Sequence, residues 1–150
     1  MTFDIVKMRQ EAEAGSCPSQ CMLGLCYLYG IDVEVNYKEA FRFLSAAAEQ
    51  DALRAVLNLG RMYAQGLGVQ QNAPEAVRHF EAVAKLPDSG DTFQAKIELG
   101  RIFSHGLGVT SDTKMALKWY ASAIEIATDT DDPEEKEEAR KYLDNANNSQ

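Results

Sequence analysis

Apolar residues recur along the chain at spacings of three and four, the pattern of amphipathic helices, and they do so in blocks that nearly copy one another. Residues 23–30 return as residues 59–66 and again as residues 99–106. The glycine of each block lies at position 24, 60 or 100, so the blocks are 60 − 24 = 36 and 100 − 60 = 40 residues apart. A period of about 20–50 residues is typical of a solenoid, whose units pack mainly against their neighbours.

Each block predicts two helices, which we call helix A and helix B, joined by a glycine-containing turn. In the second block, Asp51 is the expected N-cap of helix A, and Gly66 ends that helix because its C-terminal residue often needs a positive φ. Asn36 and Asp112 are the expected N-caps of helix B in the first and third blocks. The four extra residues of the longer period fall at positions 86–90, which predicts a longer loop.

The glycines in the middle of each helix A oppose helix formation by about 0.8–1.0 kcal/mol relative to alanine. Their presence in all three copies therefore predicts that helix B packs closely against them. The small residues that match them on helix B are Ala40, Ala76 and Ala116.

Further helices are expected at the two ends of the chain. The first covers residues 2–14, with Phe3, Ile5, Val6 and Met8 on its apolar side, and the last begins at Asp132 and Pro133. The pattern predicts an all-α, right-handed α-solenoid of about eight helices in one domain. Its expected parts are a capping helix at 1–15, repeats at 16–50, 51–90 and 91–130, and a capping helix and tail at 131–150.

The third block carries the most complete motif. It combines Leu99-Gly100, the turn at residues 106–109, Ala116 and the pair Trp119-Tyr120. This motif resembles the Sel-1-like repeat, a relative of the tetratricopeptide repeat. The resemblance covers roughly residues 16–128, although the pair is His79-Phe80 in the second block and Phe43-Leu44 in the first, where Asp32 also replaces a turn glycine. It implies a scaffold or adaptor that binds proteins or peptides.

Composition and charge narrow the function further. Hydrophobic residues make up 45% of the chain, enough for a core, and the formal net charge of −8 argues against nucleic acid as a partner. No apolar run reaches the roughly 18–20 residues of a membrane span. The first residues lack the apolar segment of a signal peptide, so we do not expect one there. Three cysteines are an odd number, which favours a reducing compartment, and we expect the cytoplasm.

Candidate chemistry is sparse. Cys17 and Cys21 are four residues apart and could both reach one metal, but they align with apolar residues of the other blocks, which favours ordinary packing. His79 and His105 lack a nucleophile at motif spacing, and no Ser-x-x-Lys occurs. We therefore predict that the chain has no metal site, no cofactor and no enzymatic activity. A small hydrolase and a structural oligomerising spacer remain the alternatives.

A binding face follows from the resemblance, because helix A lines the concave side of tetratricopeptide-type solenoids. Arginines along this face would bind carboxylates of an acidic protein or peptide. Leu25 and Tyr29 of the first repeat would add an apolar end to the face. In the alternative interpretation the arginines cover neighbouring helices and pair with glutamates. We expect the chain itself to be a monomer. The predicted binding residues are Leu25, Tyr29, Arg54, Arg61, Gln65, Gln94, Arg101 and His105.

Overall fold

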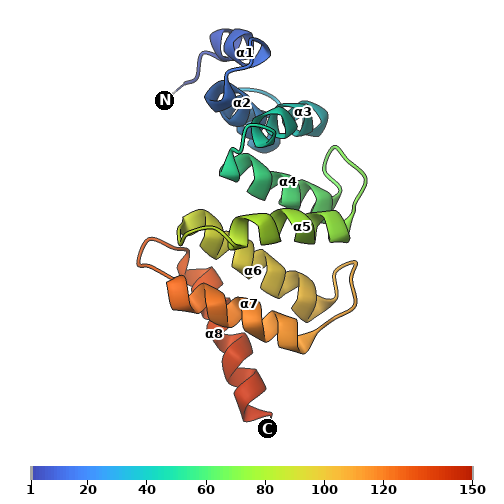
Figure 1. Cartoon of the computed structure of the whole chain (residues 1–150). Coiled ribbons are helices and arrows are strands. Elements are labelled where there is room, and N and C mark those ends of the chain that lie inside the picture. Colours follow the sequence, from blue (N-terminus) through green and yellow to red (C-terminus); the bar gives the residue numbers. More distant parts are fainter. Residues whose placement is uncertain (1, 150) are drawn as a thin grey trace. The chain divides into compact units, whose positions relative to one another are not determined.

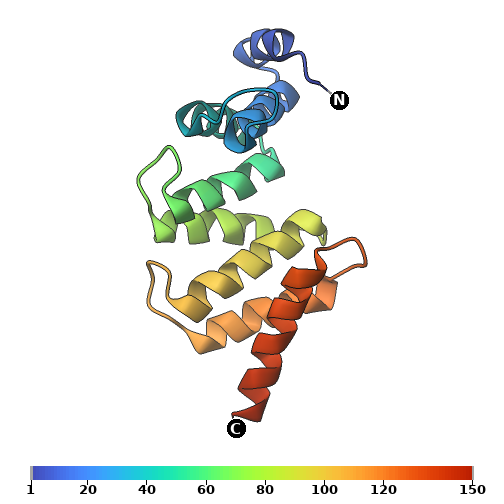
Figure 2. The ribbon, with the colours of Figure 1, turned by 180° about the vertical axis from the view of Figure 1, so that it is seen from behind.

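The computed structural model describes residues 2–149, and within that range all regular structure is helical, as predicted. Figures 1 and 2 show the helices from opposite sides. None of these helices has the length and apolar character that crossing a membrane requires. They are α1 (Ile5–Glu13), α2 (Cys17–Tyr29), α3 (Tyr37–Ala48), α4 (Leu53–Gln65), α5 (Ala73–Ala84), α6 (Gly90–His105), α7 (Thr113–Ile126) and α8 (Pro133–Asn148).

The chain forms two compact units, Met1–Asn72 with α1–α4 and Ala73–Gln150 with α5–α8. The boundary falls inside the second repeat, after its turn. In the first unit, α1 packs on α2, α2 on α3 and α3 on α4, and α2 also touches α4. In the second unit, α5 packs on α6, α6 on α7 and α7 on α8, and α6 also touches α8. In the first unit, the helix A of one repeat therefore touches the helix A of the next. In the second unit, the helix A of the third repeat touches α8, which follows in the same position.

The first unit holds two apolar clusters. One joins α1 to α2 and α3 through Ala12, Leu23 and Phe43, and the other fills the space between α2, α3 and α4. Helix α1 begins at Ile5 rather than Thr2 because the Asp4 side chain accepts a hydrogen bond from the backbone N–H of Lys7. Val6 is 71% exposed, so its assignment to the apolar side of this helix was wrong.

The second unit has a core cluster of Phe93, Ile97, Tyr120, Ala123 and Ala139. The four extra residues of the longer period do not all lengthen the loop. Helix α6 has 16 residues where α4 has 13, and only the fourth extra residue lies in the loop. The longer helix starts at a capping box, in which Ser89 and Thr92 bind each other's backbone N–H.

Two aspartates take the left-handed conformation that glycine usually provides. Asp51 has φ of 62° and lies between α3 and α4. The N-cap of α4 is Ala52, so the prediction that Asp51 caps this helix was wrong. Asp32 has φ of 58°, close to the 68° of Gly68 at the same position of the next turn. Aspartate adopts this region more readily than most residues. The first turn therefore keeps the backbone conformation of the others despite its lost glycine.

The close contact between helix A and helix B is confirmed in both units. A Cβ on Gly24 would lie 2.7 Å from Leu44 Cγ, and a Cβ on Gly100 would lie 2.7 Å from Tyr120 Cδ1. The nearest atoms thus belong to a large side chain of helix B, not to the alanine one turn earlier that the sequence suggested. The glycine makes room for the residue that fills the crossing.

Candidate functional site

The predicted binding residues divide between the two units. Those in the first unit lie on α2 and α4, which touch each other, and those in the second lie on α6, which touches α8. The residues on α2 and α4 are Leu25, Tyr29, Arg54, Arg61 and Gln65, and those on α6 are Gln94, Arg101 and His105.

Tyr29 is the last residue of α2, and it is 54% exposed. Its hydroxyl donates to Asn58 Oδ1 on α4 at 2.9 Å, and Asn58 Nδ2 donates to the backbone oxygen of Arg54 at 2.7 Å. The buried amide therefore has a bond at each of its two polar atoms and holds the exposed ring in place. Sequence reasoning missed Asn58, because its equivalents are Met22 and Glu98, and the repeats share no polar residue at this position.

The other predicted residues of the first unit surround this bond. Leu25 is half-buried against the cluster between α2 and α4, and Arg61 is also half-buried. Arg54 and Gln65 are exposed on α4. Both arginines already take part in interactions within the chain. The predicted face of this unit is thus an apolar edge on α2 beside a cationic helix α4.

Arg101 binds a carboxylate, as the sequence predicted, but this carboxylate belongs to the same chain. Its Nε lies 3.0 Å from Glu138 Oε1 and its Nη2 lies 2.6 Å from Glu138 Oε2, a fork-to-fork pair. Glu98 and Glu135 each lie 3.4 Å from Nη1. For this arginine the structure matches the alternative interpretation, in which the arginines pair with glutamates. Helix α8 supplies two of these three carboxylates.

The same cluster shifts the titration of its members. The hydrogen bonds that Arg101 donates to Glu138 raise the pKa of Arg101 above its ordinary value. Burial is the largest influence on Tyr120, whose hydroxyl donates to Glu138 at 2.9 Å, and it raises the pKa of this phenol. Partial burial alone would raise the pKa of Glu138, but the bonds from Arg101 and Tyr120 outweigh it and leave that pKa lowered. The carboxylate of Glu138 is therefore stabilised in its charged form.

The two remaining predicted residues of the second unit lie near this cluster on α6. His105 is exposed, and its Nδ1 lies 3.0 Å from the backbone oxygen of Arg101 and 2.9 Å from Ser104 Oγ. Gln94 is half-buried and interacts within the chain. The predicted face of this unit is largely bound to the chain's own groups.

The cysteines pack as the repeat comparison predicted. Cys26 is fully buried, and this burial raises the pKa of its thiol. Cys17 and Cys21 are half-buried against the cluster between α2 and α4, and Cys17 Sγ lies 3.8 Å from the backbone oxygen of Ala47. Across residues 2–149, no group of three or more His, Cys, Asp or Glu side chains is arranged to hold a metal ion.

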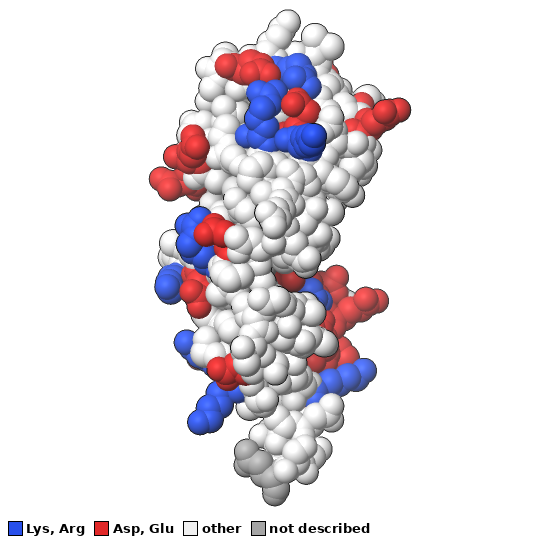
Figure 3. All heavy atoms as spheres, turned by 90° about the vertical axis from the view of Figure 1, so that its right-hand side faces the viewer, with Lys and Arg blue, Asp and Glu red and all other residues white. Residues whose placement is uncertain are grey.

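A charged network joins α1 to α3. Arg42 Nη2 lies 2.9 Å from Glu13 and 3.1 Å from Glu39, and Arg9 Nη2 also lies 3.1 Å from Glu39. The Arg42 guanidinium stacks 4.0 Å from the ring centroid of Phe43. Figure 3 shows basic and acidic side chains lying against one another near the N-terminal end. These charges compensate each other within the fold.

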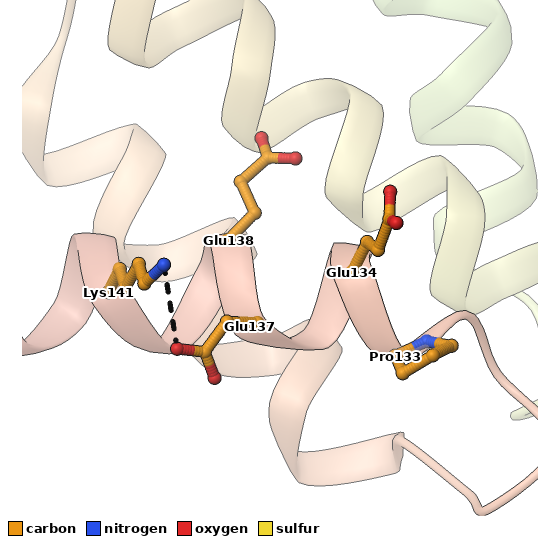
Figure 4. A pocket seen from close by; sticks show the side chains of 5 residues that line it. All are labelled: Pro133, Glu134, Glu137, Glu138 and Lys141. Carbon is orange, nitrogen blue, oxygen red and sulfur yellow. Dashed lines mark ion pairs between the residues drawn. The ribbon is translucent and has the colours of Figure 1, made fainter.

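A hollow of about 540 Å³ lies on α8, lined by Pro133, Glu134, Glu137, Glu138 and Lys141. Figure 4 shows Glu138 directed toward the neighbouring helix, and Glu137 paired with Lys141 at 3.7 Å. Glu138 is the residue that binds Arg101. Cations of the chain itself therefore already bind two of the three carboxylates in this hollow.

Exposed apolar side chains mark a surface that sequence reasoning missed. Apart from Tyr29, which belongs to the predicted face on α2 and α4, those of the first repeat are Met22 on α2, and Ile31, Val35 and Tyr37 in and directly after the turn that follows it. Only Tyr29 was predicted, because the turn was treated as scaffold. The available signal was that this turn departs from its two copies in the chain.

Comparison with known proteins identifies the repeats. The Sel1 repeat model matches residues 17–51, 53–88 and 94–126. A protective antigen of uropathogenic Escherichia coli with an SLR fold is 30% identical, with a TM-score of 0.69 over 83% of this chain and 26% of the antigen. A Sel1 repeat protein from Oxalobacter formigenes is 26% identical, with a TM-score of 0.62 over 82% of this chain and 54% of that one. No curated protein matches the chain at the significance required. The chain thus spans about a quarter and about half of these two structures.

Proposed function

Because the chain belongs to the Sel1 repeat family, we propose that it is a protein- or peptide-binding adaptor whose binding face lies on α2 and α4. Sel1 repeat proteins are generally scaffolds for protein interaction. The observation that carries the location is the exposed ring of Tyr29, anchored through its hydroxyl on Asn58. A rigid aromatic side chain loses little conformational entropy when a partner covers it, and tyrosine is enriched among residues that dominate binding energy.

The chemistry around Tyr29 supports a partner with both apolar and acidic groups. Leu25 adds apolar surface on the same helix, and Arg54 and Arg61 place guanidinium groups on α4. A partner carboxylate would exchange places with the groups that these arginines contact now. In the second unit Glu138 already forms the fork-to-fork pair with Arg101, which favours the first unit as the binding face. The three free thiols support a reducing, cytoplasmic setting as part of this proposal.

The test begins with affinity capture by the whole chain from its native host and identification of the captured protein. Binding of that purified partner is then measured by calorimetry to the wild type and to single variants. Tyr29→Ala and Arg61→Ala should each weaken binding by about tenfold or more, the effect of losing an anchor residue.

The controls are His105→Ala, which truncates the residue equivalent to Tyr29 in the third repeat, and Arg78→Ala, which removes an exposed arginine of α5 that pairs with Glu75. Both should bind as the wild type does, and circular dichroism should show unchanged helicity in all four variants. Weaker binding by the controls with unchanged binding by Tyr29→Ala and Arg61→Ala would move the site off α2 and α4.

A further inference from the structure

The turn between helix A and helix B occurs three times in this chain, and the first copy differs from the others in a consistent direction. It has Glu34 where the later turns have Gln70 and Thr110. It has Val35 where they have Gln71 and Ser111, and Tyr37 where they have Ala73 and Thr113. At these three positions the two later copies are neutral and polar or small, whereas the first carries additional apolar groups and an additional carboxylate.

The backbone of the turn does not require these residues. The three turns make the same closing hydrogen bond at 2.9 Å, from Asn36 N to Tyr27 O, from Asn72 N to Tyr63 O, and from Asp112 N to Phe103 O. Polar side chains at position 35, and alanine or threonine at position 37, are therefore compatible with this conformation, because the other turns adopt it with them. The closing hydrogen bond of the turn does not account for the apolar residue at position 35.

The apolar groups of the first turn face solvent. Val35 is 50% exposed, Tyr37 is 40% exposed and Ile31 is 39% exposed. The three residues lie within seven positions of one another, and Val35 folds back toward Gly30, where its Cγ2 would be 3.0 Å from an added Cβ. Exposed apolar side chains grouped in one short segment are the kind of surface that protein interaction sites use.

The charge around this surface is acidic. Asp32 and Glu34 alternate with the apolar residues of the turn, and both are exposed. The Asp32 carboxylate is fixed, because its Oδ2 accepts a hydrogen bond from the backbone N–H of Phe3 at 2.7 Å. Lys38 contributes the opposite charge at the start of α3, so the local balance is two carboxylates to one ammonium group. This balance favours a basic partner over an acidic one.

We propose that Ile31, Asp32, Glu34, Val35 and Tyr37, which we call the turn surface, bind a protein segment with an apolar side chain flanked by lysine or arginine. This surface is separate from the face on α2 and α4, whose proposed partner is acidic. Its partner is therefore a second protein, or a second segment of the first. The inference does not depend on the function proposed for Tyr29.

The test uses two synthetic 12-residue peptides and the ¹⁵N-labelled full chain. One peptide carries Leu-Phe between lysines, and the other carries the same residues between glutamates. On titration, the basic peptide should shift the amide resonances of residues 31–37, and the acidic peptide should not. The decisive variant combines Glu34→Gln, Val35→Gln and Tyr37→Ala, which gives these three positions the residues of the second turn. It should fold normally and bind the basic peptide about tenfold more weakly or worse.

A reciprocal variant guards against an indirect effect. Thr110→Glu, Ser111→Val and Thr113→Tyr give three positions of the third turn the residues of the first, and they should create new peptide-dependent shifts at residues 107–113. Tyr29→Ala should leave peptide binding unchanged, which separates this surface from the face on α2. Equal affinity of the wild type and the first triple variant, or equal binding of the two peptides, would overturn the proposal.

Discussion

Gly24 and Gly100 stand where helix B places a large side chain against helix A. At Gly100 an added Cβ would approach Cδ1, Cε1 and Cζ of Tyr120 to within 2.7–2.8 Å, and real Cβ atoms do not come that close. The Tyr120 hydroxyl is held by Glu138, and its side chain is 1% exposed, so the ring has little freedom to move away. Space, rather than backbone conformation, therefore explains this glycine.

Gly100→Ala should destabilise the protein by about 1–3 kcal/mol, because the overpacking outweighs the gain in helix propensity. Gly90→Ala is the matched control, since Gly90 begins the same helix and an added Cβ there would meet only Asp131 Oδ1 at 3.6 Å. The control should change stability by less than about 1 kcal/mol. Urea denaturation monitored by circular dichroism measures both. Equal effects would remove the steric explanation.

At this scale the sequence identified the glycine but not its contact. Three mid-helix glycines that oppose helix propensity were a sufficient signal for a close crossing. The contact with Leu44 and Tyr120, one turn beyond the expected alanines, depends on how the two helices are rotated against each other. Apolar periodicity defines the buried face of a helix, but it does not fix which residue of that face meets a given position on the neighbour.

Helix α8 is held to the second unit by two kinds of contact. Ala139 is fully buried in the cluster with Phe93, Ile97 and Tyr120, and Glu138 receives hydrogen bonds from Arg101 and Tyr120. The polar contact joins three helices at one carboxylate. Loss of this charge leaves the Arg101 guanidinium, which is half-buried, without its bidentate partner.

Glu138→Gln should therefore lower stability at pH 7 by about 1–3 kcal/mol. The folded pKa of Glu138 is lowered, so its contribution is complete above the unfolded pKa of about 4.3 and is lost as the pH falls through the folded value. The gap between wild type and variant should accordingly close in acid, below about pH 4. Glu137→Gln, at the neighbouring residue, removes only an exposed pair with Lys141 and should cost less than about 1 kcal/mol. Chemical denaturation across this pH range provides the comparison, and a gap that persists unchanged in acid would contradict it.

Local signals predicted most helix starts but not which charged side chains pair between helices. Asn36, Asp112 and Asp132 cap α3, α7 and α8 as expected, because each side chain bonds to backbone within three residues. The earlier start of α6 was missed because the Ser89–Thr92 capping box lies in a segment rich in loop-forming residues. The pairing of Arg101 with Glu138 spans 37 residues, and no local pattern sets that register.

At the scale of the whole chain, the two sides of α8 differ in character. Its side toward α7 keeps the apolar pattern of a helix A, with Ala139 and Leu143 matching Ala95 and Leu99. The side of α6 that packs against its helix B, α7, carries Phe93, Ile97 and Gly100. At the equivalent positions α8 has Glu137, Lys141 and Asp144. Glu137 and Lys141 pair with each other, with side-chain exposures of 57% and 72%. The helix is therefore apolar toward the repeat it covers and charged where a further helix B would pack, as a solenoid cap must be.

Replacing this charged side with the residues of α6 should turn the cap into an open repeat. The variant Glu137→Phe, Lys141→Ile, Asp144→Gly exposes an apolar stripe that none of the helices within residues 2–149 covers. We expect this variant to self-associate, whereas we expect the wild type to remain a monomer. Sedimentation equilibrium at several protein concentrations measures the difference. A control with Lys118→Phe and Glu125→Ile adds similar apolar side chains at exposed positions of α7, where they do not reproduce a helix A surface, and it should stay monomeric. If both variants associate equally, added hydrophobicity alone is responsible. If neither does, the three charges of α8 are not what keeps this side of the helix from associating.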